Sequence, residues 1–311
     1  MKARLLKRGG LLLAALAVAG GTAFVVATDG PHLPKDARGT LVFVSDRSGV
    51  DNLYLRELPD GRDRRLTDLA EAVRDPALSP DARRVAFTVG GRLGVVDVAG
   101  GPVRMLSLER AFRDQAPVWL PDGSGLVVAA QVTETAPRDI HMLRLQPGGD
   151  PVRRPLTETA HLDESQPAVA PDGATIAFVR EDHLYRIGTD GSGARRITGG
   201  FRLVRSPRFL PSGRIVFLWT EGKEYGIDVV DADGKGRETL QKGSTFYRRA
   251  VPSPDGRFLA ATFAFDLSFH PWEALKSRQH DELRLLDLQH AQATELADSW
   301  RYANHSADWG R

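Results

Sequence analysis

The sequence predicts an all-β fold, a six-bladed β-propeller with four strands in each blade. Three observations predict it: a Pro-Asp-Gly type of turn recurs, strand-like apolar runs lie at fixed distances from each turn, and the predicted strands fall into sets of four. The turn prolines are Pro80, Pro121, Pro171, Pro211 and Pro254. Their spacing gives a period of about 40 to 50 residues, which is typical of propeller blades.

The clearest copy of the turn lies within residues 166–179. Pro171 favours the first central position of a type I turn, Asp172 follows, and Gly173 suits the left-handed position that closes a hairpin. The β-branched and aromatic run that ends at Val179 then predicts a strand. Some copies depart from this pattern, because Ala82 replaces the turn glycine and Ser212 the turn aspartate.

The chain enters the ring at the second strand of a blade, residues 40–44, and continues with a third strand, residues 52–55, and a fourth strand that ends near Thr67. The same order recurs along the chain and gives six second, third and fourth strands but five first strands. The missing first strand is predicted around Trp309, whose spacing matches that of Trp119. We therefore expect the C-terminal strand to close the ring by joining the N-terminal blade, since an open ring would leave a sheet edge unpaired.

The repeated pattern Pro-x-x-Ser/Ala/Leu-Pro-Asp-Gly-x-x-x-Ala-Phe, followed by Leu-Tyr and Leu-Thr, resembles the TolB-type (WD40-like, PD40) propeller repeat over residues 39–311. The resemblance implies a propeller that binds proteins in the cell envelope. TolB itself has an additional N-terminal domain, for which we expect no room between Ala27 and Gly39.

Residues 1–27 are predicted to be a signal peptide or signal anchor, and residues 28–38 a linker. The basic residues Lys2, Arg4, Lys7 and Arg8 precede an uncharged apolar run over residues 11–27, which we expect to form a leader helix. We therefore expect an exported protein, in the periplasm or at the cell surface, that contacts the membrane only through an uncleaved leader.

Charge and composition exclude several function classes. The formal net charge is +2, and the first 28 residues contribute +4 of it, so the remaining chain carries −2 and has no basic footprint for nucleic acid. The absence of cysteine excludes disulfides and thiolate chemistry. Because the sequence has no nucleophile elbow, zinc-protease motif or phosphate-binding loop, we assign no catalytic residue, metal or cofactor.

The loops that enter each first strand should converge on the mouth of the central channel. They carry charges that form our candidate binding residues: Asp75, Asp114, Asp163, Glu164, Arg205, Arg248, Arg249 and His305. The acids come from blades 2 to 4 and the bases from blades 5, 6 and 1. They are either solvated loop charges without a common target or a polarised mouth that orients a charged partner segment.

The longest insertion, residues 264–281, is predicted on the same face of blade 6. It is either a lid on the propeller or an interaction loop with Phe269, His270 and Trp272 as contacts. We expect a monomeric propeller that binds an envelope protein or another ligand. The alternative is a propeller lyase or hydrolase that acts on a saccharide or peptide at the mouth.

Overall fold

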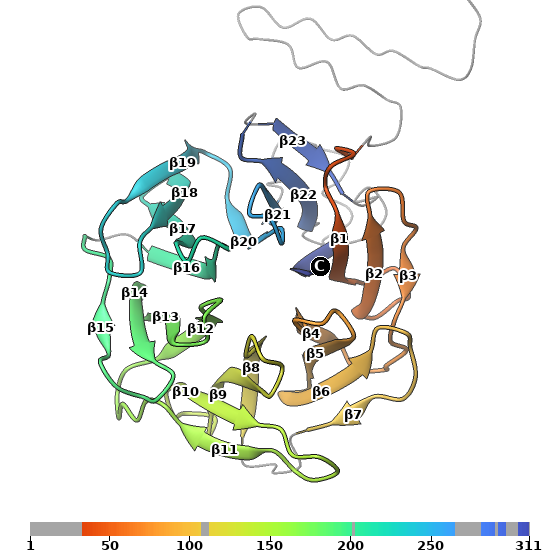
Figure 1. Ribbon diagram of the computed structural model, residues 1–311, viewed down its shortest axis with the longest axis horizontal. Helices are drawn as coiled ribbons and strands as arrows, with labels where there is room; N and C mark the ends of the chain where they lie inside the picture. The colour runs from red at the N-terminus through yellow and green to blue at the C-terminus, as the bar shows by residue number, and fades with distance from the viewer. Residues whose placement is uncertain are drawn as a thin grey trace, which may run out of the picture. The chain divides into compact units, whose positions relative to one another are not determined.

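Four-stranded antiparallel sheets surround a central axis (Figure 1). The computed structural model describes residues 33–106, 112–200, 203–264, 281–289, 292–296 and 304–310. These residues form six such sheets, so the predicted six-bladed all-β propeller is confirmed. The predicted leader, residues 1–27, lies outside the described residues. Within the described ranges, no helix is long and apolar enough to cross a membrane.

The first three blades are listed from the innermost to the outermost strand. Blade 1 contains β24 (Asn304–Gly310), β1 (Gly39–Ser45), β2 (Asn52–Leu58) and β3 (Arg64–Arg65). Blade 2 contains β4 (Val73–Leu78), β5 (Arg84–Val89), β6 (Arg92–Asp97) and β7 (Arg104–Met105). Blade 3 contains β8 (Arg113–Trp119), β9 (Gly125–Gln131), β10 (Asp139–Arg144) and β11 (Val152–Pro155).

The remaining three blades follow the same order. Blade 4 contains β12 (Glu164–Val169), β13 (Thr175–Arg180), β14 (His183–Gly188) and β15 (Arg195–Arg196). Blade 5 contains β16 (Leu203–Phe209), β17 (Ile215–Glu221), β18 (Glu224–Val230) and β19 (Glu238–Gly243). Blade 6 contains β20 (Tyr247–Pro252), β21 (Phe258–Ala264), β22 (Asp281–Asp287) and β23 (Gln292–Glu295).

The last strand of the chain closes the ring, as the sequence predicts. β24 pairs antiparallel with β1, with Leu41 opposite Trp309. The Trp309 ring stacks on Phe258 of blade 6 at a centroid distance of 6.4 Å, and its Nε1 donates a hydrogen bond to the Arg38 carbonyl at 3.0 Å. One strand therefore connects the N-terminal blade to the last blade.

The hydrophobic core lies between blades. Among the described residues, six apolar clusters each join two neighbouring blades. Second-strand aromatics such as Phe87, Phe178 and Phe217 are fully buried within these clusters. Because burial of apolar surface is the main favourable term in folding, each blade depends on both of its neighbours.

The Pro-Asp-Gly turns have the geometry that the sequence predicts. The N–H of Gly173 donates to the Ala170 carbonyl at 2.9 Å, and Gly173 adopts a φ of 71°. Asp172 Oδ1 accepts a hydrogen bond from the N–H of Ala174 at 2.9 Å. The inner strands of blades 2 to 6 each run from the channel mouth to such a turn, so the turns lie on the opposite face of the ring.

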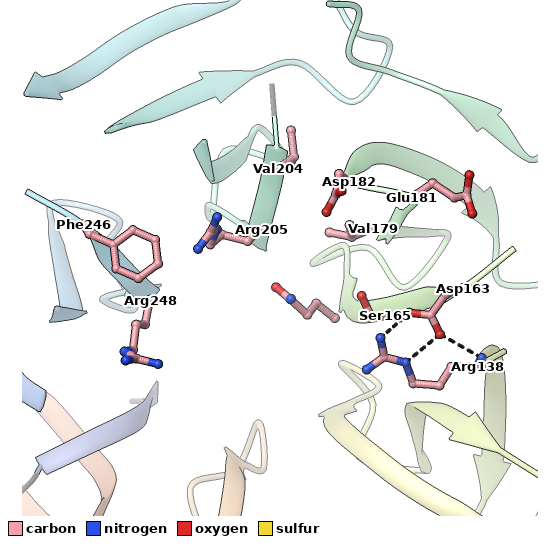
Figure 2. Close-up of a pocket in the computed structure, with 11 residues that line it drawn as sticks. Arg138, Asp163, Ser165, Val179, Glu181, Asp182, Val204, Arg205, Phe246 and Arg248 are labelled. Carbon is pink, nitrogen blue, oxygen red and sulfur yellow. Dashed lines mark hydrogen bonds and ion pairs between the residues drawn. The ribbon is translucent and has the colours of Figure 1, made fainter. Parts of the chain in front are cut away.

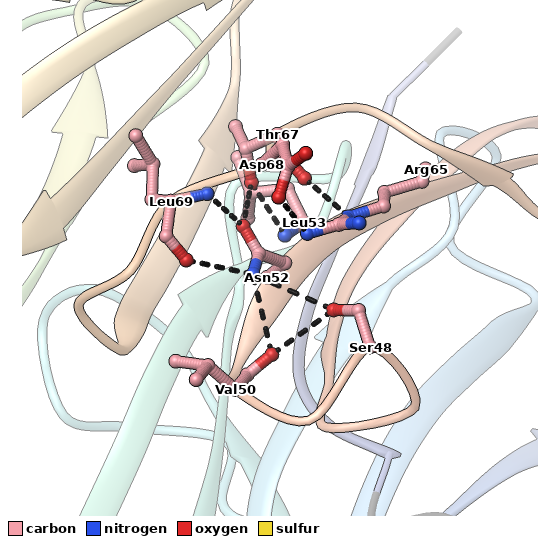
Figure 3. Close-up of polar contacts among 8 residues, drawn as sticks. All are labelled: Ser48, Val50, Asn52, Leu53, Arg65, Thr67, Asp68 and Leu69. Atoms are coloured by element: carbon pink, nitrogen blue, oxygen red, sulfur yellow. Dashed lines mark hydrogen bonds and ion pairs between the residues drawn. The ribbon is translucent and has the colours of Figure 1, made fainter.

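The threonine of the Leu-Thr pattern secures the outermost strand (Figure 3). Thr67 Oγ1 accepts a hydrogen bond from the N–H of Leu53 at 3.0 Å and donates to Asn52 Oδ1 at 2.8 Å. Thr157 and Thr198 accept equivalent bonds from the third strands of blades 3 and 4. The hydroxyl thus continues the sheet where these short outer strands end.

Candidate functional site

The inner strands share a β-bulge that shapes the channel. At the bulge, five residues adopt a φ between 47° and 53°: Asp75, Ala116, Gln166, Ser206 and Ser306. A left-handed φ is costly for residues other than glycine, so the surrounding structure must hold it. Hydrogen bonds between blades do so, because Asp75 Oδ2 accepts from the N–H of Ala116 at 3.2 Å and Gln166 Oε1 accepts from the N–H of Ser206.

A cavity lies at the mouth of the channel, between blades 3, 4, 5 and 6. We call it the mouth pocket, and its volume is about 530 Å³. Its lining residues are Arg138, Asp163, Ser165, Gln166, Val179, Glu181, Asp182, Val204, Arg205, Phe246 and Arg248. The predicted residues Asp163, Arg205 and Arg248 therefore share one pocket.

Opposite charges face each other across the mouth pocket (Figure 2). Arg205, Phe246 and Arg248 lie on one wall and Asp182 lies on the other, whereas the carboxylate of the neighbouring Glu181 points away from the arginines. The Arg205 guanidinium lies 4.7 Å from the centroid of the Phe246 ring and donates to Thr220 Oγ1 at 3.1 Å. Burial lowers the pKa of Arg205, which the negative charge of Asp182 partly offsets.

Glu181 and Asp182 form the tight turn between β13 and β14, and both have positive φ, 46° and 64°. Blade 2 uses two glycines, Gly90 and Gly91, in the equivalent turn. Acidic side chains thus occupy backbone positions that favour glycine, and such strain in a surface turn is a pointer to function.

Asp163 is held by an arginine from the neighbouring blade. Arg138 donates to Asp163 Oδ1 through its backbone N–H at 3.0 Å and through Nε at 2.9 Å, and its Nη2 forms an ion pair with Oδ2. These hydrogen bonds lower the pKa of the Asp163 carboxyl. Arg138 Nη1 also donates to Gln115 Oε1 at 2.9 Å. The pair therefore fixes the wall between blades 3 and 4.

A second cavity of about 180 Å³ continues the mouth pocket into the channel, and we call it the channel cavity. Asp75 and Arg249 line it and form an ion pair between blades 2 and 6. Burial alone would raise the pKa of Asp75. The charge of Arg249, the N–H of Ala116 and the charge of Arg208 outweigh this effect and hold the pKa below its ordinary value.

Arg208 on β16 and Asp308 on β24 complete the charge cluster around this pair. Burial and the nearby charge of Arg249 lower the pKa of Arg208 to about 10. Burial raises the pKa of Asp308, although the charge of Arg208 opposes the shift. Asp308 Oδ2 also accepts from the N–H of Leu78 at 2.7 Å. Both side chains keep some exposed surface.

Three other predicted residues lie outside the linings of the two cavities. Asp114 is fully buried and accepts two hydrogen bonds from Arg153 Nη2, at 2.9 and 2.8 Å. Glu164 is also fully buried and pairs with Arg180 at 2.6 Å. His305 Nε2 lies 3.4 Å from Asp51 Oδ1. The structure places these groups in contacts within blades or between adjacent strands.

The predicted interaction loop cannot be placed in the same way. Phe269, His270 and Trp272 lie outside the described residues. In the described part of the chain, no three metal-ligating side chains gather into a cluster.

Sequence reasoning missed several lining residues. Arg138 ends a loop whose length is visible in the sequence, and Glu181 and Asp182 lie in a turn that the strand order places on the mouth face. Phe246 directly precedes β20. The strand phasing could have identified these four residues, but it gives no indication of Arg208 or Asp308, whose charges interact with Arg249.

Comparisons with known proteins bear on this arrangement. No family model matches the chain. A TolB homolog of Chlorobium luteolum is 33% identical over 141 residues, which are 45% of this chain and 31% of the relative. A TolB homolog of Chlorobium chlorochromatii is 27% identical over 143 residues, 45% of this chain and 30% of the relative. The matches span less than a third of the length of these curated relatives.

Solved structures give a longer match. TolB from Acinetobacter baumannii has a TM-score of 0.72 at 14% identity, over 89% of this chain and 68% of that one. The propeller is TolB-like. An oligogalacturonate lyase in complex with manganese has a TM-score of 0.61 at 16% identity, over 86% of this chain and 76% of that one. At these identities the structural matches show the fold alone, and the TolB likeness rests on repeat and fold together.

Proposed function

We propose that this TolB-like propeller is exported and binds a segment of a protein partner in the cell envelope at its channel mouth. The observation that carries the proposal is the mouth pocket, about 530 Å³ in volume, with Arg205 and Arg248 on one wall and Asp182 and the Arg138–Asp163 ion pair on the other. Its volume lies in the range of ligand sites. The basic and apolar leader supports export.

The lining suits binding better than catalysis. The acids with resolved pKa shifts in the two cavities, Asp75 and Asp163, both have lowered pKa values and are engaged by arginines. Among the described residues that line the cavities there is no histidine. A general acid or base instead needs a pKa close to the working pH.

The second candidate is a propeller enzyme that acts on a saccharide or peptide at the mouth. Its support is the structural similarity to an oligogalacturonate lyase and to a puromycin hydrolase, which has a TM-score of 0.58 at 18% identity. Turnover of an oligosaccharide or peptide that is lost in an Asp163→Asn variant would favour this candidate over binding.

Affinity capture from an envelope extract tests the binding proposal. The baits are the full chain, an Arg205→Glu/Arg248→Glu variant, a chain lacking residues 268–279, and the control Arg154→Gln. Arg154 lies on β11, the outermost strand of blade 3, and donates to the carbonyls of Thr189 and Asp190. It lines neither the mouth pocket nor the channel cavity.

We expect the native chain and the Arg154→Gln control to retain one partner that the charge-reversed variant loses. Its retention should weaken as salt rises, because salt screens interactions between exposed charges. Equal capture by the charge-reversed variant would contradict binding at the mouth. Loss in the shortened chain alone would assign binding to the loop instead.

A further inference from the structure

Side chains at the bulges of the inner strands join neighbouring blades around the channel. Asp75 of blade 2 accepts a hydrogen bond from the N–H of Ala116 in blade 3, and Gln166 of blade 4 accepts one from the N–H of Ser206 in blade 5. The Ser206 hydroxyl in turn accepts from the N–H of Ala250 in blade 6 at 3.1 Å. In each case a side chain of one blade holds the backbone of the next.

Ala116 interrupts this arrangement between blades 3 and 4. It occupies the equivalent bulge position, with a φ of 47°, but its methyl group cannot accept a hydrogen bond. The channel cavity lies at this boundary, because Gln115 and Ala116 of blade 3 and Ser165 and Gln166 of blade 4 line it. A longer side chain at position 116 would reach into the cavity, so the small residue leaves room for a ligand group.

The size of the channel cavity suits part of a ligand. Its volume of about 180 Å³ lies below the range of whole ligand sites, about 300–1,000 Å³. It shares Arg138, Ser165, Gln166 and Arg248 with the lining of the mouth pocket. A segment bound at the mouth can therefore extend one side chain into the channel cavity.

Two glutamine side chains offer hydrogen-bond donors to the channel cavity. Gln115 Oε1 accepts from Arg138 Nη1 at 2.9 Å, and Gln166 Oε1 accepts from the N–H of Ser206. These bonds orient both amides, and within the described ranges neither amide nitrogen has a hydrogen-bond partner. Because an amide nitrogen only donates, the two nitrogens favour a ligand group with an acceptor such as a carbonyl oxygen.

The ion pairs of the lining favour an uncharged group. A carboxylate in the channel cavity would lie near Asp75 and an ammonium group near Arg249, so either would compete with the existing pair between these residues. Arg138 is likewise engaged by Asp163. Removal of one partner from a largely buried pair is costly. A neutral amide has a carbonyl oxygen and a donor of its own, and it leaves both pairs intact.

We propose that the channel cavity receives one amide side chain, glutamine or asparagine, from the partner segment, and that Ala116 is the specificity-determining residue that makes room for it. The proposal rests on the proposed function and names the group that anchors the segment. The ligand's amide oxygen accepts from the side-chain nitrogens of Gln115 and Gln166. Its amide nitrogen donates to the hydroxyl of Ser165, which lines both cavities.

Three short peptides test the chemistry of the ligand group. They are acetyl-Gly-Gln-Gly-amide, acetyl-Gly-Glu-Gly-amide and acetyl-Gly-Met-Gly-amide, each titrated into the full chain while the side-chain amide resonances of Gln115 and Gln166 are followed by NMR. We expect the glutamine peptide to shift both resonances, and the other two peptides to bind at least about ten-fold more weakly, since they lack the neutral amide. No binding of the glutamine peptide, or equal binding of either other peptide, would overturn the proposal.

Variants of Ala116 test its role. Ala116→Gln should fill the channel cavity and bind the glutamine peptide at least about ten-fold more weakly, whereas the conservative variant Ala116→Ser should keep the cavity and the affinity. Both residue types already occupy the bulge position in other blades, as Gln166 and Ser206, and a thermal melt checks that the variants fold. Arg154→Gln should bind like the native chain. Native affinity in Ala116→Gln, or equal losses in the two Ala116 variants, would contradict the assigned role.

Failure of this proposal is distinguishable from failure of the proposed function. Ala116 does not line the mouth pocket, so its variants leave that lining unchanged. If the glutamine peptide fails but the envelope partner is still captured through the mouth, only the anchoring group is wrong. If capture at the mouth also fails, the proposed function fails with it.

Discussion

Asp75 both lines the channel cavity and holds inner strands of different blades together. It lines the channel cavity, and its ion pair with Arg249 joins blades 2 and 6. It also accepts a hydrogen bond from blade 3 and occupies a left-handed bulge. A residue that the sequence places among candidate binding charges is thus also part of the framework that holds the inner strands together.

Replacement of Asp75 by asparagine should therefore destabilise the fold. We expect Asp75→Asn to lower the free energy of unfolding at pH 7 by about 3 kcal/mol, because Arg249 would lose its partner in a largely buried site. Urea denaturation measures the change. An unchanged midpoint would contradict a structural role for this pair.

The difference in free energy of unfolding between the native chain and Asp75→Asn should depend on pH. The folded-state pKa of Asp75 is lowered, whereas its unfolded value is about 3.9. The stabilisation it contributes is therefore fully present above that value and is lost as the pH falls through the lower folded-state pKa. The difference between the native chain and Asp75→Asn should shrink in the acid range, and a constant difference would contradict this assignment.

Ala82 is strained at the position where other turns have glycine. Its φ is 53°, and its N–H donates to the Ser79 carbonyl at 2.8 Å. We expect Ala82→Gly to stabilise the protein by about 0.5–1 kcal/mol, since relief of the left-handed strain exceeds the entropic cost of glycine. Thermal melting measures this effect.

Gly173→Ala is the matched reverse variant. Its φ is 71°, and a Cβ there would lie 3.7 Å from its nearest neighbour, an ordinary contact. Backbone strain alone should destabilise this variant, by about 1 kcal/mol. If both variants changed stability in the same direction, turn strain would not explain either of them.

At the scale of elements, the sequence predicts strands and turns well because their patterns are local. Gly173 and Asp172 make the turn that their residue types favour. The bulges are different. They place side chains such as Gln166 against the backbone of the next blade, and that contact depends on a residue 40 positions away. Local patterns therefore predict the elements but not the bulges that direct charges into the channel.

Arginines of the outermost strands show a second feature that depends on neighbouring blades. Arg104 of blade 2 donates to the Gly149 carbonyl of blade 3 at 2.8 Å, and Arg154 of blade 3 donates to the Asp190 carbonyl of blade 4 at 3.0 Å. These side chains reach across blade boundaries at the outer edge, where the apolar clusters end. They add contacts between blades to those of the core.

The closing strand β24 should have a larger effect on stability than its length suggests. Trp309→Ala is expected to cost about 3–5 kcal/mol, because it empties a buried site where blades 1 and 6 meet. Trp309→Phe keeps an aromatic ring but loses the hydrogen bond to Arg38, and should cost about 1 kcal/mol. Chemical denaturation of both variants measures the difference. Equal, small losses would contradict the closure by this strand.

At the scale of the whole molecule, the ring follows from the repeat, but the site follows only in part. The strand order places the first-strand charges near the mouth, and Asp163, Arg205 and Arg248 do meet in one pocket. It does not distinguish these groups from Asp114 and Glu164, which are buried in ion pairs. Which charges reach the cavity depends on side-chain direction at each bulge, and the sequence pattern does not determine that.

The central claim is that this propeller works through its mouth face and not through its turn face. Hydrogen–deuterium exchange of the full chain, with and without the captured partner, tests it most directly. We predict slower exchange in the turn at Glu181 and Asp182 and at the starts of β16 and β20, with no change at the Pro-Asp-Gly turns. Protection confined to turns such as residues 121–123 and 171–173 would contradict the account.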